Sequence, residues 1–285
     1  MMVFWAHRMR WKEVIAFLVC VIPITALGEP VAARQLEGTL HGFLSLSNAN
    51  GKIVAVGDLF QDVQGDRVTS RLLFRFKDGS IDDETTVFTQ RGNFLLISNH
   101  HIQKGPSFPH PLDLSIDAQS GQVIVRSVAK DGKEESTVEH LDLPPDLYNG
   151  LIIPVTKNLK PDAPETRVSM IVATPKPRLV KLALLPLGDE PFSLAGFQRK
   201  SSLFEINIEL GGVVGLVAPL IGMQPPKIKI WILGGQNPTF LREEGPMYGG
   251  GGAYVDQSDQ PGLASRHAPP LKTRPRTKLN LPLAK

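Results

Sequence analysis

The chain has 285 residues, of which 42% are hydrophobic and 21% are charged, and its formal net charge is +3. The stretch 263–285 holds six basic residues and no acidic one, whereas the body before it has more acidic than basic residues. The charge of the body therefore gives no reason to expect nucleic-acid binding. The only cysteine, Cys20, lies near the N-terminus, so we expect no disulfide and no cysteine-bound zinc.

The N-terminal residues 1–28 predict a secretory signal peptide. Arg8, Arg10 and Lys12 precede an apolar run over 14–27, and residues 26–28 read Ala-Leu-Gly. A basic segment, a short apolar segment and a small-x-small site are typical of a cleaved export signal. The apolar run is shorter than the ~20 residues of a membrane-spanning helix. We expect a periplasmic or secreted protein, with a retained N-terminal anchor as the alternative.

Apolar and polar residues alternate through most of the body, with turn dipeptides such as Asn50-Gly51 and Asp78-Gly79 between the runs. Side chains of a strand point to opposite faces in turn, so this period of two predicts sheets with one solvent-exposed face. Glycine accepts the positive φ of tight hairpin turns. The predicted strands lie near 36–46, 52–62, 67–77, 84–91, 93–102, 112–117, 122–129 and 134–141.

One helix is predicted after residue 142. Asp142 is a suitable capping residue, and the prolines after it suit a first helical turn. Apolar residues then recur at every fourth position: Leu147, Leu151, Val155 and Leu159. This spacing places them on one helical face. Pro154 is expected to end or kink the helix.

A second set of predicted strands lies near 166–174, 178–186, 202–210, 227–233 and 239–243. Between them, the uncharged, glycine-rich segment 211–223 suits either a buried loop or short helix that closes the barrel, or a flap that faces lipid. Residues 253–285 predict a disordered basic tail. The fold class is mainly β (α+β): a single domain over 29–252, whose antiparallel sheet forms a half-barrel or open barrel with one packed helix.

The sequence contains no nucleophile elbow, phosphate-binding loop, metalloprotease motif or dinucleotide fingerprint. We therefore nominate no catalytic residue and expect no cofactor. Adjacent strand residues face opposite ways, so His100 is grouped with Leu96, and His101 with Ile97. No metal site is expected; His100 and His140 would be the ligands if one exists. Residues 82–84 (Asp-Asp-Glu) are interpreted as a solvated strand entry.

Three strands, near 93–97, 179–185 and 228–232, are apolar on both faces. Such strands occur where a sheet is covered or curls around something. A thick core explains them, and so does a concave sheet around an apolar ligand. On the second interpretation, the candidate ligand-binding residues are Phe74, Phe94, Leu96, Leu151, Val214, Leu216, Trp231 and Phe240.

Several short motifs are similar to a family of uncharacterised secreted bacterial proteins. They are the segments 78–79 (Asp-Gly), 84–86 (Glu-Thr-Thr), 105–109 (Gly-Pro-Ser-Phe-Pro), 142–150 (Asp-Leu-Pro-Pro-Asp-Leu-Tyr-Asn-Gly), 237–240 (Asn-Pro-Thr-Phe) and 244–248 (Glu-Gly-Pro-Met-Tyr). The resemblance spans roughly 36–250 and carries over no catalytic residue. The order of strands also resembles periplasmic half-barrels that carry lipids or lipoproteins, although a fold does not fix a function.

These observations favour an exported, non-enzymatic protein that binds an apolar or amphipathic, lipid-like ligand in a β half-barrel. The expected partners are a lipid or another apolar ligand, and also an envelope protein or a membrane surface. One alternative is a structural or interaction protein of the cell envelope without a ligand. A second alternative is a hydrolase whose site is dispersed along the sequence.

Overall fold

The computed structural model describes residues 28–128, 133–174, 176–194, 197–209, 227–247 and 253–258. Its strands form one 14-stranded sheet, in which every neighbouring pair is antiparallel, in the order β8-β7-β6-β5-β4-β3-β2-β1-β14-β13-β12-β11-β10-β9. The sheet is open, with β8 and β9 at its two edges. The predicted mainly β fold, an open barrel with one helix, is confirmed for the described part of the chain.

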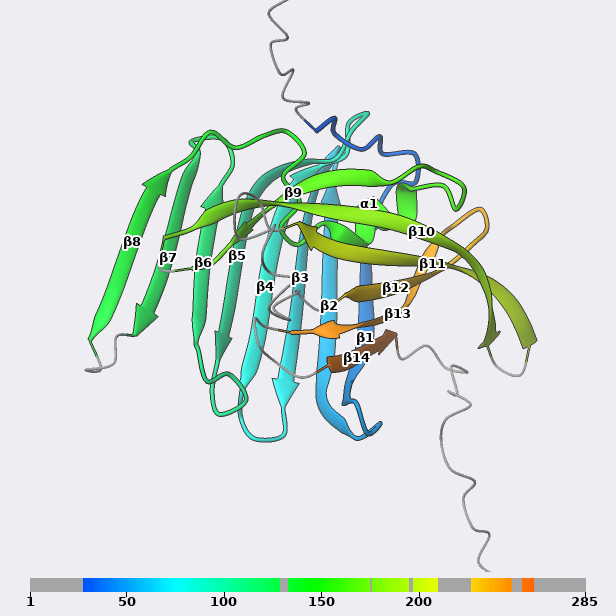
Figure 1. Ribbon diagram of the computed structural model, residues 1–285, viewed down its shortest axis with the longest axis horizontal. Coiled ribbons are helices and arrows are strands. Elements are labelled where there is room, and N and C mark those ends of the chain that lie inside the picture. The colour runs from blue at the N-terminus through cyan, green and yellow to red at the C-terminus, as the bar shows by residue number, and fades with distance from the viewer. Residues whose placement is uncertain are drawn as a thin grey trace, which may run out of the picture.

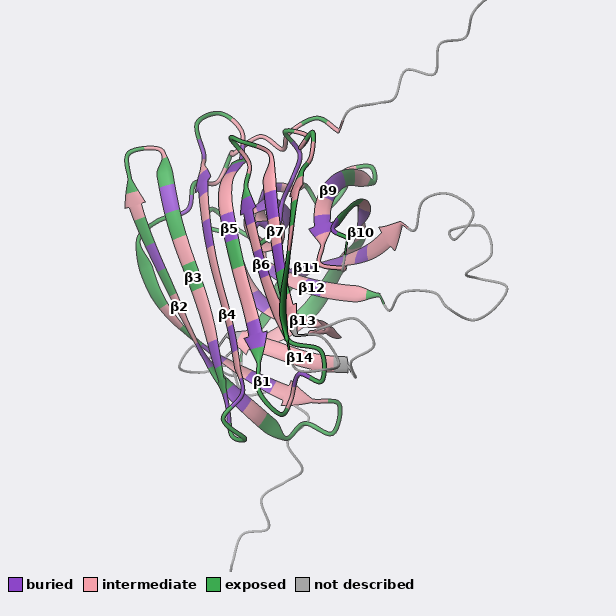
Figure 2. Cartoon of the chain, turned by 90° about the vertical axis from the view of Figure 1, so that its left-hand side faces the viewer, coloured by how far each residue is buried: buried purple, intermediate pink, exposed green. Residues whose placement is uncertain are grey.

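The first eight strands form a continuous meander that we call the wall (Figure 1). They are β1 (Leu40–Asn48), β2 (Ile53–Gln64), β3 (Arg67–Phe76), β4 (Ile81–Thr89), β5 (Leu95–Lys104), β6 (Leu112–Asp117), β7 (Gln122–Val128) and β8 (Glu134–His140). Tight turns join β1 to β2, β2 to β3 and β3 to β4, and Gly79, with φ of 86°, occupies the predicted turn between β3 and β4. Buried and exposed residues alternate along these strands (Figure 2).

The remaining strands lie across the wall (Figure 1). They are β9 (Thr166–Val172), β10 (Arg178–Leu194), β11 (Phe197–Glu209), β12 (Ile228–Leu233), β13 (Thr239–Pro246) and β14 (Ala253–Ser258). β14 pairs with both β1 and β13, and so joins the crossing strands to the wall. The sheet extends past Gly252, the predicted end of the domain, because residues 253–258 complete this junction. We call the surface between the wall and the crossing strands the inner face.

The inner face holds two hydrophobic clusters. The larger cluster combines wall residues such as Phe88 and Leu114 with Leu184 and Phe204 of the crossing strands. The smaller cluster lies mainly on β1 to β3. Its buried members are Leu44, Leu46, Ala55, Phe74, Phe76 and Phe108. Burial of apolar surface between the wall and the crossing strands therefore stabilises the open barrel.

Helix α1 (Ile152–Asn158) is shorter than predicted and begins later. Its N-cap is Leu151, with no capping side-chain hydrogen bond, so the prediction that Asp142 caps it is wrong. The preceding segment instead runs beside β9, where Leu147 and Ser169 form a parallel bridge. Pro154 lies in the first helical turn, where a backbone N–H has no partner within the helix, so it neither ends nor breaks α1.

Strands β10 and β11 form a longer hairpin than predicted, extending to Leu194 and back from Phe197. Their outer part is mostly exposed and mixes polar residues with exposed apolar residues such as Leu187 and Phe197, so hydrogen bonding continues where apolar alternation has stopped. Among the described residues, no helix has the length and apolar character needed to cross a membrane. Residues 1–27 of the predicted signal peptide and the segment 211–223 lie outside the described residues.

Candidate functional site

Polar side chains interrupt the apolar inner face on β4 and β5. Asp82 lies opposite Phe74 of β3, and Glu84 lies opposite Leu72, so both acids share the face of the hydrophobic residues. With their neighbours they form a group that we call the inner polar cluster. Its members are Asp82, Glu84, Thr86, Asn99, His101, Gln103 and Glu243. Charged groups on an otherwise apolar face are costly unless partnered, and they mark a candidate site.

Two residues of β5 hold the Asp82 carboxylate. His101 Nε2 lies 2.8 Å from Asp82 Oδ1, and Gln103 Nε2 donates to Oδ2 over 2.8 Å. Gln103 Nε2 also donates to the Met247 carbonyl, 3.0 Å away, just after β13. Burial alone lowers the pKa of His101, but the negative charge of Glu84 and the hydrogen bond to Asp82 raise it to about 9. His101 is therefore an imidazolium at neutral pH.

Asn99 positions Glu84 and Thr86. Its Nδ2 donates to Glu84 Oε1 and to Thr86 Oγ1, both over 2.9 Å. Gly150 covers these three side chains with its backbone, since a Cβ at this position would collide with Thr86 Oγ1. Gly150 also has φ of 67°, which glycine adopts readily. Position 150 therefore favours glycine for two reasons: a side chain would collide with Thr86, and the backbone has a positive φ.

Glu243 brings a further carboxyl to the cluster from the crossing strands. It pairs with Ile230 of β12, which is fully buried, and with Asp256 of β14. Burial raises the pKa of Glu243 to about 7, and the negative charge of Glu84 adds to the increase. Glu84 on the wall and Glu243 on the crossing strands therefore interact electrostatically, although they are 159 positions apart in the chain.

The cluster can accept hydrogen bonds and can exchange protons near neutral pH. Its charged members are three acids and one imidazolium, and in the described residues neither Glu84 nor Glu243 forms an ion pair with lysine or arginine. A cationic or hydrogen-bond-donating group would be complementary to it. Within the described part of the chain, no group of three or more His, Cys, Asp or Glu is arranged to hold a metal ion.

The interpretation of residues 82–84 as a solvated strand entry is wrong for Asp82, which is 8% exposed on the inner face. The sequence reasoning also missed the inner position of His101. The register of β4 and β5 shifts between Val87 and Phe88, which leaves an extra residue on β5 between Leu96 and Ser98. This bulge reverses the alternation, so Leu96 shares its face with His101 and not with His100.

His100 and His140 are not brought together. His100 lies on the outer face, where its Nε2 is 3.0 Å from Asp113 Oδ1. His140 is on β8, and β6 and β7 lie between the two histidines. Three strand spacings separate them by about 15 Å. A single metal ion cannot bridge that distance.

The sequence-predicted ligand-binding residues fall into three groups. Phe94, Leu96 and Leu151 belong to the larger hydrophobic cluster, Phe74 belongs to the smaller one, and partly buried Phe240 packs against both. Val214 and Leu216 lie outside the described residues. Trp231 is on the outer face, where its Nε1 donates to Glu190 over 3.0 Å and the Arg242 guanidinium lies 5.4 Å from the ring.

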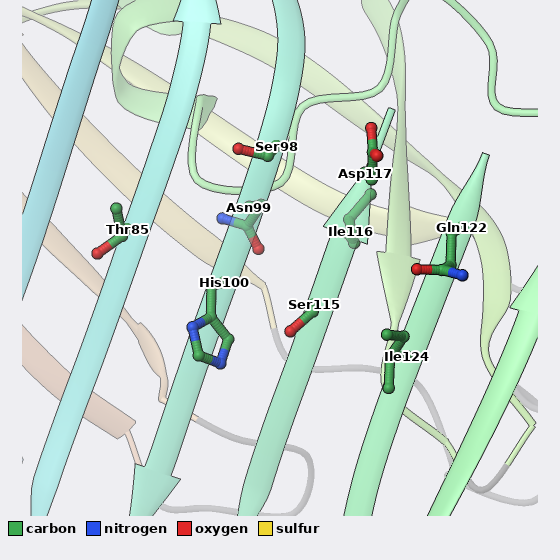
Figure 3. Close-up of a pocket in the computed structure, with 9 residues that line it drawn as sticks. All are labelled: Thr85, Ser98, Asn99, His100, Ser115, Ile116, Asp117, Gln122 and Ile124. Atoms are coloured by element: carbon green, nitrogen blue, oxygen red, sulfur yellow. The ribbon is translucent and has the colours of Figure 1, made fainter. Parts of the chain in front are cut away.

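Two hollows border the sheet, and Asn99 of the inner polar cluster lines only the first of them. The first, of about 250 Å³, lies among outer-face side chains that include Thr85, His100 and Gln122 (Figure 3). The second, of about 180 Å³, is lined by Leu95, Leu143 and neighbouring prolines. Both are smaller than the ~300–1,000 Å³ typical of small-molecule pockets. Neither hollow is therefore large enough for a lipid-sized ligand.

Ser169, Lys181 and Asp146 form a hydrogen-bonded group whose residue types resemble a catalytic nucleophile and its base. Ser169 Oγ accepts from Lys181 Nζ over 2.7 Å and donates to Asp146 Oδ1 over 3.0 Å. Lys181 also forms an ion pair with Asp146. Ser169 and Asp146 have no exposed surface, so a substrate cannot contact them in this structure. The group ties the segment before α1 to β9 and β10.

The fold and the cluster define an open antiparallel β-barrel with a polar inner site. No protein-family model matches the chain, and no curated protein matches it. A solved β-barrel-like protein of a domain of unknown function, DUF1849, from Brucella abortus is similar with a TM-score of 0.44 and 8% identity. The match covers 78% of this chain and 97% of that one. A likeness at this level carries no conclusion about what the chain binds.

Proposed function

We propose that the protein is an exported, non-enzymatic binding protein, periplasmic or secreted, that takes an amphipathic, lipid-like ligand against its inner face. The observation that carries the proposal is the direct contact between apolar and charged surface there. Leu72 and Phe74 of β3 lie opposite Glu84 and Asp82 of β4. A ligand with one apolar and one polar end would find partners for both within a single strand spacing.

The apolar end of the ligand would contact the smaller hydrophobic cluster. Several side chains pack against that cluster without being fully buried, and so retain surface that a ligand can cover. They are Val54, Leu59, Leu72, Phe240, Met247 and Tyr254. Each CH₂ group transferred from water to such a surface contributes about 0.8 kcal/mol. An acyl chain of several carbons would therefore bind measurably.

The polar end of the ligand would face the inner polar cluster. Asp82, Glu84 and Glu243 offer acceptor oxygens, and His101 supplies one positive charge. This balance favours an ammonium or hydroxyl group over an anionic head group. The predicted signal peptide supports an extracytoplasmic ligand, because it would deliver the protein to a compartment bordered by membranes.

Native mass spectrometry of the full chain, expressed with its N-terminal segment, tests the proposal. We expect a co-purifying species of lipid mass, uptake of phosphatidylethanolamine from detergent, and less uptake of phosphatidylglycerol. The mass of the protein also shows whether residues 1–28 have been removed. Phe240→Ala should reduce uptake, whereas Trp231→Ala, on the outer face, should retain it. A chain that folds and takes up neither lipid would contradict the proposal.

An envelope interaction protein is the second candidate, and an exposed apolar patch on β1 and β2 favours it. His41 packs against Phe43 and Phe60 with ring centroids 4.5 and 4.0 Å apart. Phe43 is 56% exposed, Val56 55% and Phe60 47%. Contiguous exposed apolar groups often mark an interaction surface. Replacing Phe43 and Phe60 with serine should release the protein from the envelope fraction; unchanged sedimentation would count against this candidate.

A further inference from the structure

We propose that Asp146 is a binding site for the N-terminal ammonium that the chain gains when a signal peptide is removed after Gly28. An ion pair at this site fastens the new N-terminus to the segment before α1. The proposal rests on the export part of the proposed function, and it holds whether or not the inner face takes a ligand. Its basis is the position of Gly28 directly against a buried carboxylate.

Gly28 packs with its backbone against the Asp146 side chain. A Cβ at Gly28 would overlap Asp146 Oδ2 and would lie 3.2 Å from the Asp146 Cβ. Asp146 has no exposed surface, so the residue after Gly28 begins beside a carboxylate that is shielded from water. A small residue is also typical of the position just before a signal-peptide cleavage site. Glycine at this position therefore serves both the processing of the chain and its packing.

The residues after the predicted cleavage site are held in place. Val31 N donates to Tyr148 Oη over 2.7 Å, and the Val31 carbonyl accepts from Phe94 N over 3.0 Å. Two residues, Glu29 and Pro30, precede this anchor, and two residues span at most about 7 Å. The new N-terminus is thus confined to the neighbourhood of the buried carboxylate.

The Asp146 carboxylate has capacity for a further donor. Its Oδ1 accepts from Ser169 Oγ over 3.0 Å, and its Oδ2 accepts from Lys181 Nζ over 3.0 Å. An ionised carboxylate offers about four acceptor positions. The Lys181 side chain is 34% exposed, whereas the carboxylate has no contact with water. An ammonium in the place that Gly28 leaves therefore adds a second, better shielded partner for the buried charge.

The ion pair forms only after the chain has been processed. Hydrolysis by a signal peptidase adds one water across the peptide bond between Gly28 and Glu29. The C–N bond breaks, the Gly28 carbonyl carbon becomes a carboxylate that departs with residues 1–28, and the Glu29 nitrogen becomes an ammonium. In the precursor the same nitrogen is an uncharged amide. Removal of the signal peptide therefore exchanges the Gly28 backbone beside Asp146 for a positive charge.

The segment that Asp146 belongs to also covers the inner polar cluster. Tyr148 of this segment donates to the Phe94 carbonyl over 3.2 Å, and the Gly150 backbone packs against Thr86. Docking of the N-terminus at Asp146 holds the beginning of the same segment. Processing of the chain is therefore coupled to the position of the residues that cover the cluster.

N-terminal sequencing of the full chain, expressed with export, tests the first step. We expect the mature protein to begin at Glu29. A protein that keeps residues 1–28, or that begins at another position, would overturn the proposal. Lipid uptake is a separate measurement on the same sample, so this failure can be told apart from a failure of ligand binding.

Acetylation of the N-terminal amine with acetic anhydride at neutral pH tests the ion pair itself, because the reagent attacks only the uncharged amine. We expect the native mature protein to react at least about tenfold more slowly than the same chain in urea, since about 1.4 kcal/mol of pairing lowers the free amine tenfold. Asp146→Asn should remove this protection. Asp142→Asn, an exposed acid of the same segment, is the matched control and should keep it. Equal rates in the native and unfolded wild-type chain would contradict the ion pair.

A second variant keeps Asp146 and moves the ammonium instead. A mature chain with one additional methionine before Glu29 places its ammonium one residue, about 3.6 Å, further out. It should fold, and its N-terminal amine should react at the rate of the unfolded chain. If this amine is still protected, burial alone and not the ion pair with Asp146 accounts for the protection, and the proposal is wrong.

Discussion

His100 and His101 are neighbours in sequence, yet they lie on opposite faces of β5 and experience different surroundings. Each imidazole contacts an aspartate, over 3.0 Å for His100 and 2.8 Å for His101. The His100 side chain is 47% exposed and the His101 side chain 21% exposed. The aspartate beside His100 also binds Arg126, whereas His101 has a second acid nearby, Glu84. A contact with an aspartate is therefore not enough to make the charge of a histidine important for stability. The burial of the imidazole and the other charges around it decide how much it contributes.

Charged residues elsewhere on the outer face differ from those on the inner face in the same way. Its charges form exposed pairs across neighbouring strands, such as Arg71 with Asp83 and Arg75 with Asp58. Water competes for each member of such a pair, so the net contribution to stability is small. On the inner face, Asp82 and His101 are less exposed than these outer-face pairs, so water competes less for them. Their loss should therefore cost more.

Removing the inner imidazole should have the largest effect. His101→Leu leaves the Asp82 carboxylate buried with Gln103 as its remaining described donor. Breaking a buried pair in this way should destabilise the fold by about 2–4 kcal/mol. His100→Leu, one position away on the outer face, should change stability by no more than about 0.5 kcal/mol. Urea unfolding at neutral pH measures both, and equal losses would contradict the proposed difference between the faces.

The two histidines should also differ in how they affect the pH dependence of stability above neutrality. Because the pKa of His101 is raised from 6.5 to about 9, the stabilisation is fully present below pH 6.5 and is lost as the pH rises toward 9. The total loss is at most about 3 kcal/mol. Unfolding free energies measured through this window should fall in the wild-type chain and in His100→Leu. The fall should be absent in His101→Leu; if it persists there, another group is responsible.

Much of the fold could be predicted because it depends on local alternation. The strand from 67 to 77 alternates Val68, Leu72 and Phe74 with basic residues, and this pattern alone places its inner face. Turns such as Asp78-Gly79 mark where the chain reverses. Strand β14 could not be predicted in the same way. It has six residues, follows a glycine run, and pairs on one side with β13, the strand before it, and on the other side with β1, which is far away in sequence.

The candidate site depends on information that alternation does not contain. A single extra residue near Ile97 shifts the register and moves His101 to the inner face. Nothing in the local sequence requires that bulge. The electrostatic influence of Glu84 on Glu243 depends on how the crossing strands lie over the wall, which is a long-range property. The prolines and the apolar spacing after Asp142 predict a helix that begins in the segment 142–150, whereas in the structure Leu147 of this segment forms a bridge with Ser169 of β9.

The smallest predicted effect concerns an outer-face pair with favourable geometry. Arg71 donates to both carboxylate oxygens of Asp83, from Nε over 2.9 Å and from Nη2 over 2.7 Å. This hydrogen bonding holds the pKa of Asp83 below its ordinary value of 3.8. The contribution of the pair is therefore present above that value and is lost as the pH falls through the lowered pKa.

Even with two hydrogen bonds, Arg71→Gln should cost only about 0.5 kcal/mol, because the Arg71 side chain is 51% exposed. A double-mutant cycle with Asp83→Asn isolates the interaction from other effects of each substitution. The coupling energy should shrink at high salt, since exposed charges are screened. A coupling as large as the loss in His101→Leu would mean that exposure does not distinguish the two faces, and that the pairing geometry sets the energy instead.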